Sequence, residues 1–197
     1  MNKPFIAAAD RNKDAILRVL QPLVLNGKEL LEIGAGTGQH ATHCCKKLPH
    51  LLWQPTELEI NISGLQQWVS ESKASNLCAP FVLDVQYYDW RADAYDFVFT
   101  SNTVHFMSWP NIVSMFCGVS LTLKPSGLFF VYGPFYCEGS LVSEGNKKLA
   151  AWLQEQSSDF YIRGISEINN LANDYNFRLV NNYNMPSNNH LLVFRQG

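Results

Sequence analysis

Hydrophobic and polar positions alternate along this chain with two periods, one typical of helices and one typical of buried strands. Residues 14–24 carry apolar side chains at helical spacing, which predicts an amphipathic helix ahead of the first strand. Further helices are predicted at 37–48, 61–74, 108–123, about 145–157 and about 166–175. Short apolar runs predict strands at 28–33, 51–58, 80–85, 95–101 and 128–133. The letters KPSG at 124–127 predict a turn between the fourth of these helices and the last of these strands.

The C-terminal strands, predicted at 177–185 and 190–196, are joined by only four residues. Such a short link forces the two strands to run antiparallel, because a parallel crossover needs a dozen or more residues. We therefore expect a Rossmann-like α/β fold with about seven strands, mostly parallel, an antiparallel C-terminal hairpin, and helices on both faces of the sheet. The whole chain, 1–197, is expected to form one domain, with residues 1–27 as an N-terminal cap region.

The composition of the chain limits the kinds of partner that it can bind. The formal net charge is −2, so nucleic acid is an unlikely partner and a small molecule is favoured. No apolar run approaches the roughly 18 residues that span a bilayer, and no secretory leader is seen, so we expect a cytoplasmic protein. The five cysteines form no C-x-x-C pair, which suits reduced thiols. His40, His43 and Cys44 lie close in sequence but lack a second ligand pair, so we expect no metal site.

The stretch LLEIGAGTGQH at 30–40 contains the strongest candidate chemistry. Gly34, Gly36 and Gly38 follow a predicted strand, and glycine lets the backbone turn sharply and approach a ligand closely. A dinucleotide fingerprint would place its third glycine at position 39, which is Gln39. A nicotinamide cofactor is therefore disfavoured. The loop falls at the carboxyl end of the first strand, where ligands bind in open α/β sheets.

These features resemble the class I S-adenosylmethionine-dependent methyltransferases, through LLEIGAGTG, a Glu closing the second strand, LDV at 83–85 and YDFVFTSNTVHFM at 95–107. The resemblance implies S-adenosylmethionine as cofactor and the class I methyltransferase fold. It implies that Glu57 holds the ribose hydroxyls, that Asp84 and Val85 lie at the adenine, and that Asn102 lies beneath the methionine moiety. The alternatives are that Asp84 only caps the end of its strand and that Asn102 satisfies loop carbonyls. Glu32 would meet the cofactor's ammonium group, directly or through water.

A closer resemblance is to the methyltransferase-like 26 family. Five pieces carry it in the right order, namely DRNKDAIL, GTGQHATH, LPHLLWQPTE, VYGPF and MPSNNHLLVF. Two departures from its pattern are Thr56-Glu57 in place of Ser-Asp, and VHFMSWP in place of an Ile-His-Ile type of stretch. Membership implies the cofactor but names no acceptor.

Other polar residues are candidates for the acceptor side and the cofactor carboxylate. Arg11, ahead of the first helix, is predicted to bind that carboxylate through its planar guanidinium. His105 is the candidate general base, and the alternative is a histidine that orients the loop. Tyr132 is predicted to position the acceptor, or to form an aromatic wall. Asn188 and Asn189 are either loop-forming residues or acceptor contacts.

The residues therefore favour methyl transfer from S-adenosylmethionine to a small, unidentified acceptor. A non-catalytic S-adenosylmethionine-binding module that acts through a protein partner is the alternative, and a nicotinamide-dependent oxidoreductase is the third interpretation. The oligomeric state stays open.

Overall fold

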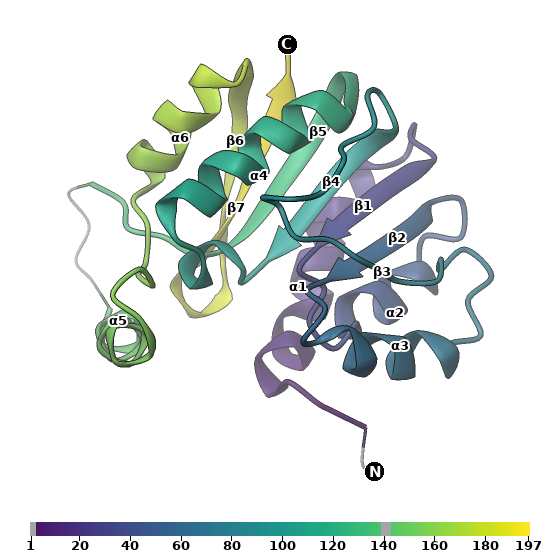
Figure 1. Cartoon of the computed structure of the whole chain (residues 1–197), viewed down its shortest axis with the longest axis horizontal. Helices are drawn as coiled ribbons and strands as arrows, with labels where there is room; N and C mark the ends of the chain where they lie inside the picture. Colours follow the sequence, from purple (N-terminus) through teal and green to yellow (C-terminus); the bar gives the residue numbers. More distant parts are fainter. Residues whose placement is uncertain (1–2, 139–142) are drawn as a thin grey trace.

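A twisted seven-stranded sheet forms the centre of the part of the chain that the computed structural model describes, residues 3–138 and 143–197 (Figure 1). The strands are β1 (Glu29–Ile33), β2 (Leu52–Glu57), β3 (Phe81–Val82), β4 (Tyr95–Ser101), β5 (Leu123–Pro134), β6 (Phe177–Met185) and β7 (Asn189–Gln196). The helices are α1 (Ala7–Leu23), α2 (Gln39–Cys45), α3 (Ile62–Ser70), α4 (Trp109–Thr122), α5 (Glu144–Gln156) and α6 (Ile165–Asp174), with 3₁₀ turns η1 (Val104–Phe106) and η2 (Pro186–Asn188).

The strand order is β3-β2-β1-β4-β5-β7-β6. The first five strands pair in parallel, whereas β7 pairs antiparallel with both β5 and β6. The predicted mostly parallel sheet with an antiparallel C-terminal hairpin is therefore confirmed. The chain moves outward from β1 to β3 and then returns to the other side of β1 with β4. This reversal makes the carboxyl end of β1 a topological switch point, the place where ligands bind in open α/β sheets.

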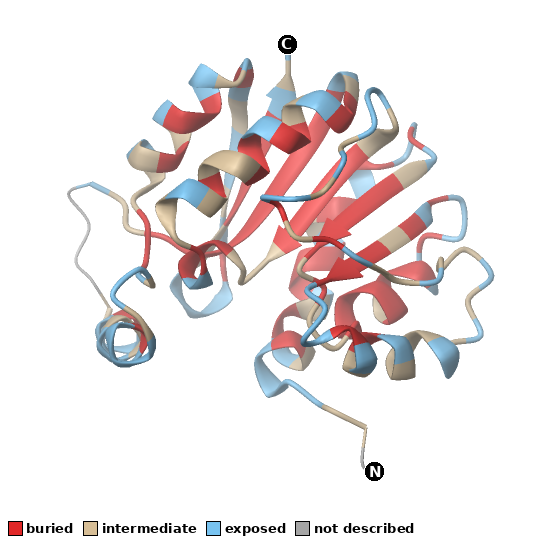
Figure 2. Cartoon of the chain, in the orientation of Figure 1, coloured by how far each residue is buried: buried red, intermediate tan, exposed pale blue. Residues whose placement is uncertain are grey.

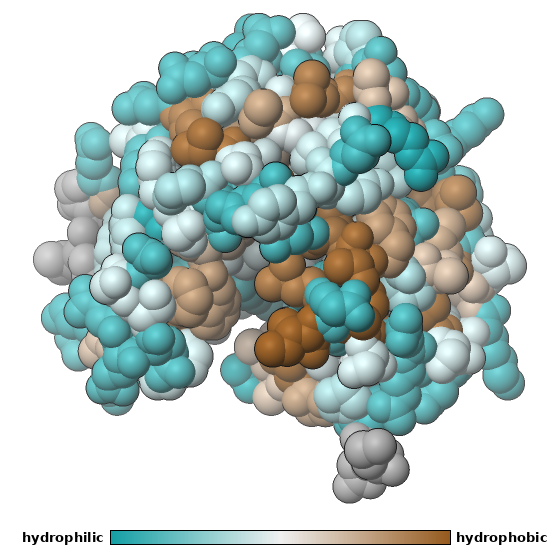
Figure 3. Space-filling model, viewed as in Figure 1, coloured by the Kyte–Doolittle hydropathy of each residue, from teal (hydrophilic) through white to brown (hydrophobic). Residues whose placement is uncertain are grey.

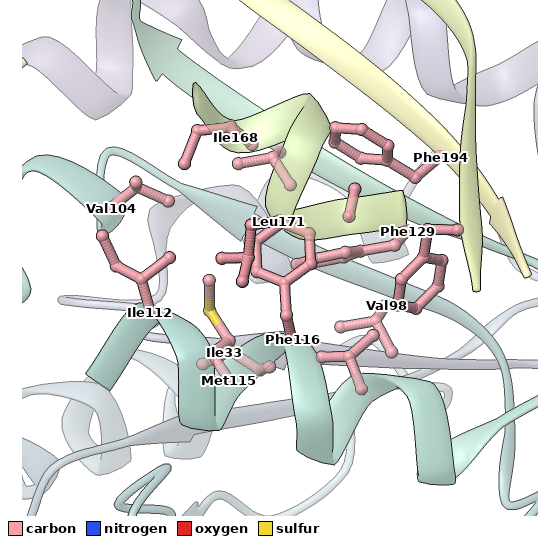
Figure 4. Close-up of a cluster of buried hydrophobic side chains, with 14 of the residues drawn as sticks. Ile33, Val98, Val104, Ile112, Met115, Phe116, Phe129, Ile168, Leu171 and Phe194 are labelled. Carbon is pink, nitrogen blue, oxygen red and sulfur yellow. The ribbon is translucent and has the colours of Figure 1, made fainter. Parts of the chain in front are cut away.

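Two apolar layers hold the sheet, one on each face, and the strands β1, β4, β5 and β7 between them are largely buried, whereas the edge strands β3 and β6 are more exposed (Figure 2). On one face, α4 and α6 direct Ile112, Met115, Phe116, Ile168 and Leu171 toward the strands (Figure 4). On the other face, α1 and α2 cover the second cluster. Strand β5 serves both layers, because Phe129 and Val131 face α4 while Phe130 and Tyr132 face α1. The alternation fixes which side chains of β5 can share a site.

Several predicted boundaries were wrong. Helix α1 begins at Ala7, well before residue 14, and α2 covers only Gln39–Cys45 of the predicted 37–48. Strand β3 is two residues long, because the backbone carbonyl of Asp84 accepts hydrogen bonds from the amides of Tyr87 and Tyr88 and turns the chain away.

The KPSG segment lies inside β5, where Ser126 has a left-handed φ of 65°. The pairing of β4 with β5 shifts register between Tyr95 and Phe97, which accommodates this local turn within one long strand. None of the described helices combines the length and the apolar character that crossing a membrane requires.

Candidate active site

The glycine loop crosses the carboxyl end of β1 with three left-handed residues. Gly34, Gly36 and Gly38 have φ values of 67°, 58° and 85°. A Cβ on Gly34 would lie 2.9 Å from Thr103 Oγ1, so this glycine lets the loop after β1 touch the loop after β4. A Cβ on Gly36 would meet only the tip of Ile6, at 3.6 Å, so the backbone there faces open space and a thin N-terminal cover. The three glycines therefore form a sharp turn after β1, with its open side at Gly36.

Glu57 ends β2 beside this loop. One oxygen, Oε2, accepts a hydrogen bond from the Gly36 amide at 2.6 Å, and Oε1 accepts from the Leu58 amide at 2.9 Å and from Asn61 Nδ2 at 3.4 Å. The side chain is buried. A carboxylate has about four lone-pair positions, so one remains beside these three contacts, and a second becomes available if a ligand displaces the longest of them, from Asn61. The structure thus brings together the two residues, Gly36 and Glu57, that the sequence predicted to share a site.

Glu32 lies next to the loop, but its carboxyl is enclosed. Trp53 Nε1 donates to Oε2 at 2.7 Å, and Oε1 has no hydrogen-bond partner within the described residues. Burial raises the pKa of Glu32 to about 8, the Trp53 hydrogen bond opposes this, and the charge of Glu57 adds to it. A buried acceptor without a donor is costly, so Oε1 is a position where a cation or a donor would be stabilised.

Asp84 and Val85 follow β3 at the same sheet edge. The Leu83 amide donates to the Glu57 carbonyl at 3.0 Å, which holds this segment beside the end of β2. Asp84 Oδ1 accepts from the Gln86 amide at 3.0 Å, so the side chain caps a turn. Val85 is buried in the layer under α4. Both residues therefore lie beside the end of β2 at the carboxyl edge of the sheet, where Asp84 caps a turn and Val85 packs into the core.

The loop after β4 supplies Asn102 and His105. Asn102 has a left-handed φ of 56°, and its amide donates to the Tyr132 carbonyl at 2.8 Å. His105 is 5% exposed, and burial lowers its pKa to about 4, so the ring is neutral at neutral pH. A Cβ on Gly133 would lie 3.8 Å from His105 Nδ1, so the ring sits over the carboxyl end of β5.

Tyr132 points to the face of β5 opposite to the one that His105 covers. Successive residues of a strand point to opposite sides, so Tyr132 faces α1 while the Gly133 position faces His105. The Tyr132 hydroxyl is enclosed, and none of the described residues meets it in hydrogen-bonding geometry. Burial raises its pKa, and the nearby amides of Asn12 and Asn189 lower it. The two predicted catalytic side chains, His105 and Tyr132, therefore lie on opposite sides of β5.

The N-terminal segment covers the glycine loop. The Ile6 amide donates to Gln39 Oε1 at 2.6 Å, and Trp68 Nε1 donates to the Pro4 carbonyl at 2.6 Å. Lys3 pairs with Glu71 at 2.7 Å. These contacts hold the start of the chain against α2 and α3.

Arg11, the candidate ligand of the cofactor carboxylate, lies in a different environment from His40 and His43, which were considered as metal ligands. Arg11 is exposed, and the described part of the chain offers it neither an ion pair nor a hydrogen bond. His40 Nε2 contacts Asn12 Oδ1 at 2.6 Å, and His43 contacts Asp14 at 2.9 Å. Within residues 3–138 and 143–197, no three His, Cys, Asp or Glu side chains come together as metal ligands would.

A cavity of about 260 Å³ at the same sheet edge was missed by the sequence reasoning. It lies between the end of β5, the start of α5 and the β6–β7 turn, and Asn188 and Asn189 line it. His190 and Cys137, 53 residues apart, meet there. His190 lies in the MPSNNHLLVF piece, but nothing in the sequence links it to Cys137, so only the pairing of β5 with β7 could have revealed their contact.

The strand order, the C-terminal hairpin and the glycine loop at the switch point define the class I methyltransferase fold, and solved structures agree. An O-methyltransferase family protein from Burkholderia thailandensis matches with a TM-score of 0.74 and 13% identity over 96% of this chain and 60% of that chain. Human N-acetylserotonin methyltransferase, solved with S-adenosylmethionine, matches with a TM-score of 0.80 and 15% identity, over 94% of this chain and 52% of that chain. PigF, solved with S-adenosylhomocysteine, matches with a TM-score of 0.78 and 15% identity, over 96% of this chain and 64% of that chain. This chain thus spans roughly half to two thirds of each protein, and identity this low shows the fold alone.

The family follows from the sequence itself. Residues 3–196 match the family described as "Protein of unknown function (DUF938)". Because the match covers nearly the whole chain, the chain belongs to this family.

Proposed function

We propose that this protein binds S-adenosylmethionine and transfers its methyl group to a small acceptor. The observation that supports this most strongly is the contact between the Glu57 carboxylate and the Gly36 amide, at 2.6 Å. This contact joins an acidic group to an open glycine backbone at the switch point of the sheet. A turn that served only to join β1 to α2 would not need a buried carboxylate against its middle glycine.

The cofactor would lie along the carboxyl edge from β3 to β4. Glu57 would accept hydrogen bonds from the ribose hydroxyls, and Asp84 and Val85 would border the adenine. Leu58, Ile60 and Val82 are exposed apolar side chains at the ends of β2 and β3. Figure 3 shows hydrophobic atoms gathered on this side of the molecule, beside a hollow that faces the part containing α5. An exposed apolar surface next to a polar loop is suited to a flat, uncharged ring.

The methionine end would lie under the loop after β4, near Asn102 and the backbone of Gly34 and Gly38. Arg11 is free to turn toward the cofactor carboxylate. Glu32 Oε1 lacks a donor and would accept one from the ammonium group or from a bridging water.

Bound S-adenosylmethionine supplies an activated methyl group, so the protein has to align the acceptor, exclude water and remove a proton. His105 would accept that proton. Its low pKa keeps it in the base form at neutral pH, although a base with a pKa of about 4 is weak until a ligand or a developing positive charge raises that pKa. Tyr132 would act from the other side of β5 by supporting Asn189 next to the acceptor.

Within this class, we propose membership of the methyltransferase-like 26 group, on the five sequence pieces quoted above. The five free cysteines support a reducing, cytoplasmic location.

The test is incubation of the protein with isotopically labelled S-adenosylmethionine and fractionated small-molecule extract. Methyl transfer predicts equal amounts of labelled product and S-adenosylhomocysteine. Affinity for S-adenosylhomocysteine without turnover in any fraction would favour the binding-module alternative, and thermal stabilisation by NADH instead would favour an oxidoreductase.

A further inference from the structure

Three side chains form a relay beside the cavity at the end of β5, the start of α5 and the β6–β7 turn. Cys137 Sγ lies 3.4 Å from His190 Nε2, and His190 Nδ1 lies 2.9 Å from Asn182 Oδ1. An amide oxygen can only accept, so the Asn182 contact fixes the proton of a neutral His190 on Nδ1. Nε2 is then the atom with a free lone pair, and it faces the thiol.

The backbone holds all three residues in place. Asn182 and His190 lie on one face of the β6–β7 ladder, where Asn184 pairs with His190 and Asn182 with Leu192. Next to Cys137, the Tyr136 amide donates to the Arg163 carbonyl at 2.9 Å, and the Ile165 amide donates to the Tyr136 carbonyl at 2.9 Å. His190 and Asn182 therefore lie on paired strands, and Cys137 lies in the loop after β5, next to the isolated bridge between Tyr136 and Gly164.

The cavity indicates which ligand would meet this thiol. Its described lining has no acidic or basic side chain apart from His190. Four side-chain amides line it, from Asn146, Asn184, Asn188 and Asn189. Neutral donors around a space of about 260 Å³ suit a small uncharged molecule with a polar oxygen, and they are suited to stabilise negative charge that develops on that oxygen.

We propose that Cys137, His190 and Asn182 form a nucleophilic thiol site that takes a small, uncharged ester or thioester. The same assembly of thiol, imidazole and amide occurs in cysteine hydrolases of unrelated fold, so it is identified by geometry rather than by sequence order. This reaction differs from the methyl transfer proposed above, although Asn189 would border the ligand in both.

The reaction has two stages. Sγ forms a bond to the carbonyl carbon while the thiol proton passes to His190 Nε2. The bond from that carbon to the leaving group then breaks, and the alcohol or thiol departs with the proton from His190. In the second stage water adds to the acyl carbon with His190 as base, the carboxylic acid leaves, and the Cys137 thiol is restored.

The chain supplies its own control thiols. Cys44 and Cys45 are buried, and burial raises the pKa of both. Cys117 is exposed, and the described residues place no histidine ring within hydrogen-bonding distance of it. A reaction driven by exposure alone would therefore prefer Cys117, whereas a reaction driven by the relay would prefer Cys137.

The experiment is acetylation by p-nitrophenyl acetate, followed by p-nitrophenolate release and by peptide mass mapping. We expect a burst of one p-nitrophenolate per chain with the acetyl group on Cys137. Cys137→Ser should abolish the burst, and Cys117→Ser should not change it. His190→Ala should slow acetylation by about 10²–10⁴-fold, the usual effect of losing a general base. Asn182→Ala should slow it less, and Asn182→Asp, which still accepts from Nδ1, should restore the rate.

Thermal unfolding and S-adenosylhomocysteine titration of each variant establish that the fold and the cofactor site are intact. Acetylation of Cys117 ahead of Cys137, or equal rates for wild type and His190→Ala, would overturn the proposal. A chain that shows the Cys137 burst without binding S-adenosylhomocysteine would leave this proposal standing and would count against methyl transfer alone.

Discussion

Replacing Glu32 with Gln should make the protein more stable at alkaline pH. Glu32 is 1% exposed and receives one hydrogen bond, from Trp53 Nε1. Gln has the same shape as the protonated acid and keeps an oxygen for Trp53, while it cannot ionise. Its amide nitrogen would also occupy the position of Oε1, which has no partner in the described structure.

The size and the sign of the effect follow from the pKa of Glu32, which rises from 4.5 to about 8 on folding. Between these two values the folded chain holds a proton that the unfolded chain has lost, so the free energy of unfolding falls as the pH rises. Each pH unit in this window removes about 1.4 kcal/mol, so the whole window corresponds to about 3–5 kcal/mol. Wild type and Glu32→Gln should have similar stabilities near pH 4.5, and the variant should be the more stable by about that amount at pH 9.

Urea denaturation of both proteins at several pH values between 4.5 and 9 measures this difference. The comparison cancels the titration of other buried groups, such as His40 and His105, whose pKa values burial lowers to about 4. A stability difference that does not change with pH would show that Glu32 is ionised in the folded protein. A variant that is less stable throughout would show that the carboxylate is needed for the fold.

Three further outcomes are expected. Arg11→Ala should weaken S-adenosylhomocysteine binding about tenfold to a hundredfold and leave adenosine binding unchanged, and calorimetry that finds equal losses would assign Arg11 to folding. His105→Ala should lower turnover about 10²–10⁴-fold at unchanged cofactor affinity once an acceptor is found, whereas unaltered turnover would make it a structural residue. Gly34 has a φ of 67°, and the Cβ of an alanine there would lie 2.9 Å from Thr103 Oγ1. Gly34→Ala should therefore lower the free energy of unfolding, measured with urea, by about 1–3 kcal/mol. An unchanged stability would contradict the close contact between the two loops.

Much of the fold could be predicted because its signals are local. Strands β4 and β6 begin and end where the apolar runs do, and the four-residue link forced the hairpin to be antiparallel. The errors arose where contacts between residues distant in sequence determine where a helix or strand begins and ends. Helix α1 extends to Ala7 in a region where Ile6 and Pro4 are held by α2 and α3, and β5 absorbs a turn because β4 provides a partner on both sides of it.

The candidate site shows the same division. The meeting of Gly36 with Glu57 could be expected, because parallel strands end at a common edge and β2 follows β1 directly. The placement of Tyr132 and His105 on opposite sides of β5 depends on which alternate residues face α1, and a run that is apolar on both faces does not indicate this. The contact of Cys137 with His190 depends on the β5–β7 register, which no local pattern specifies.

The most direct test of the central claim is calorimetric titration of wild type, Glu57→Gln and Glu57→Ala with S-adenosylhomocysteine and with its 2′-deoxyribose analogue. If Glu57 accepts from both ribose hydroxyls, Glu57→Ala should lose on the order of 2–4 kcal/mol of binding free energy, and Glu57→Gln should lose less because it keeps one acceptor oxygen. Wild type should discriminate against the analogue, and Glu57→Ala should not. Because Glu57 also holds the Gly36 amide, thermal unfolding of each variant serves as the control. Equal affinities in all three proteins would contradict a cofactor site at this switch point.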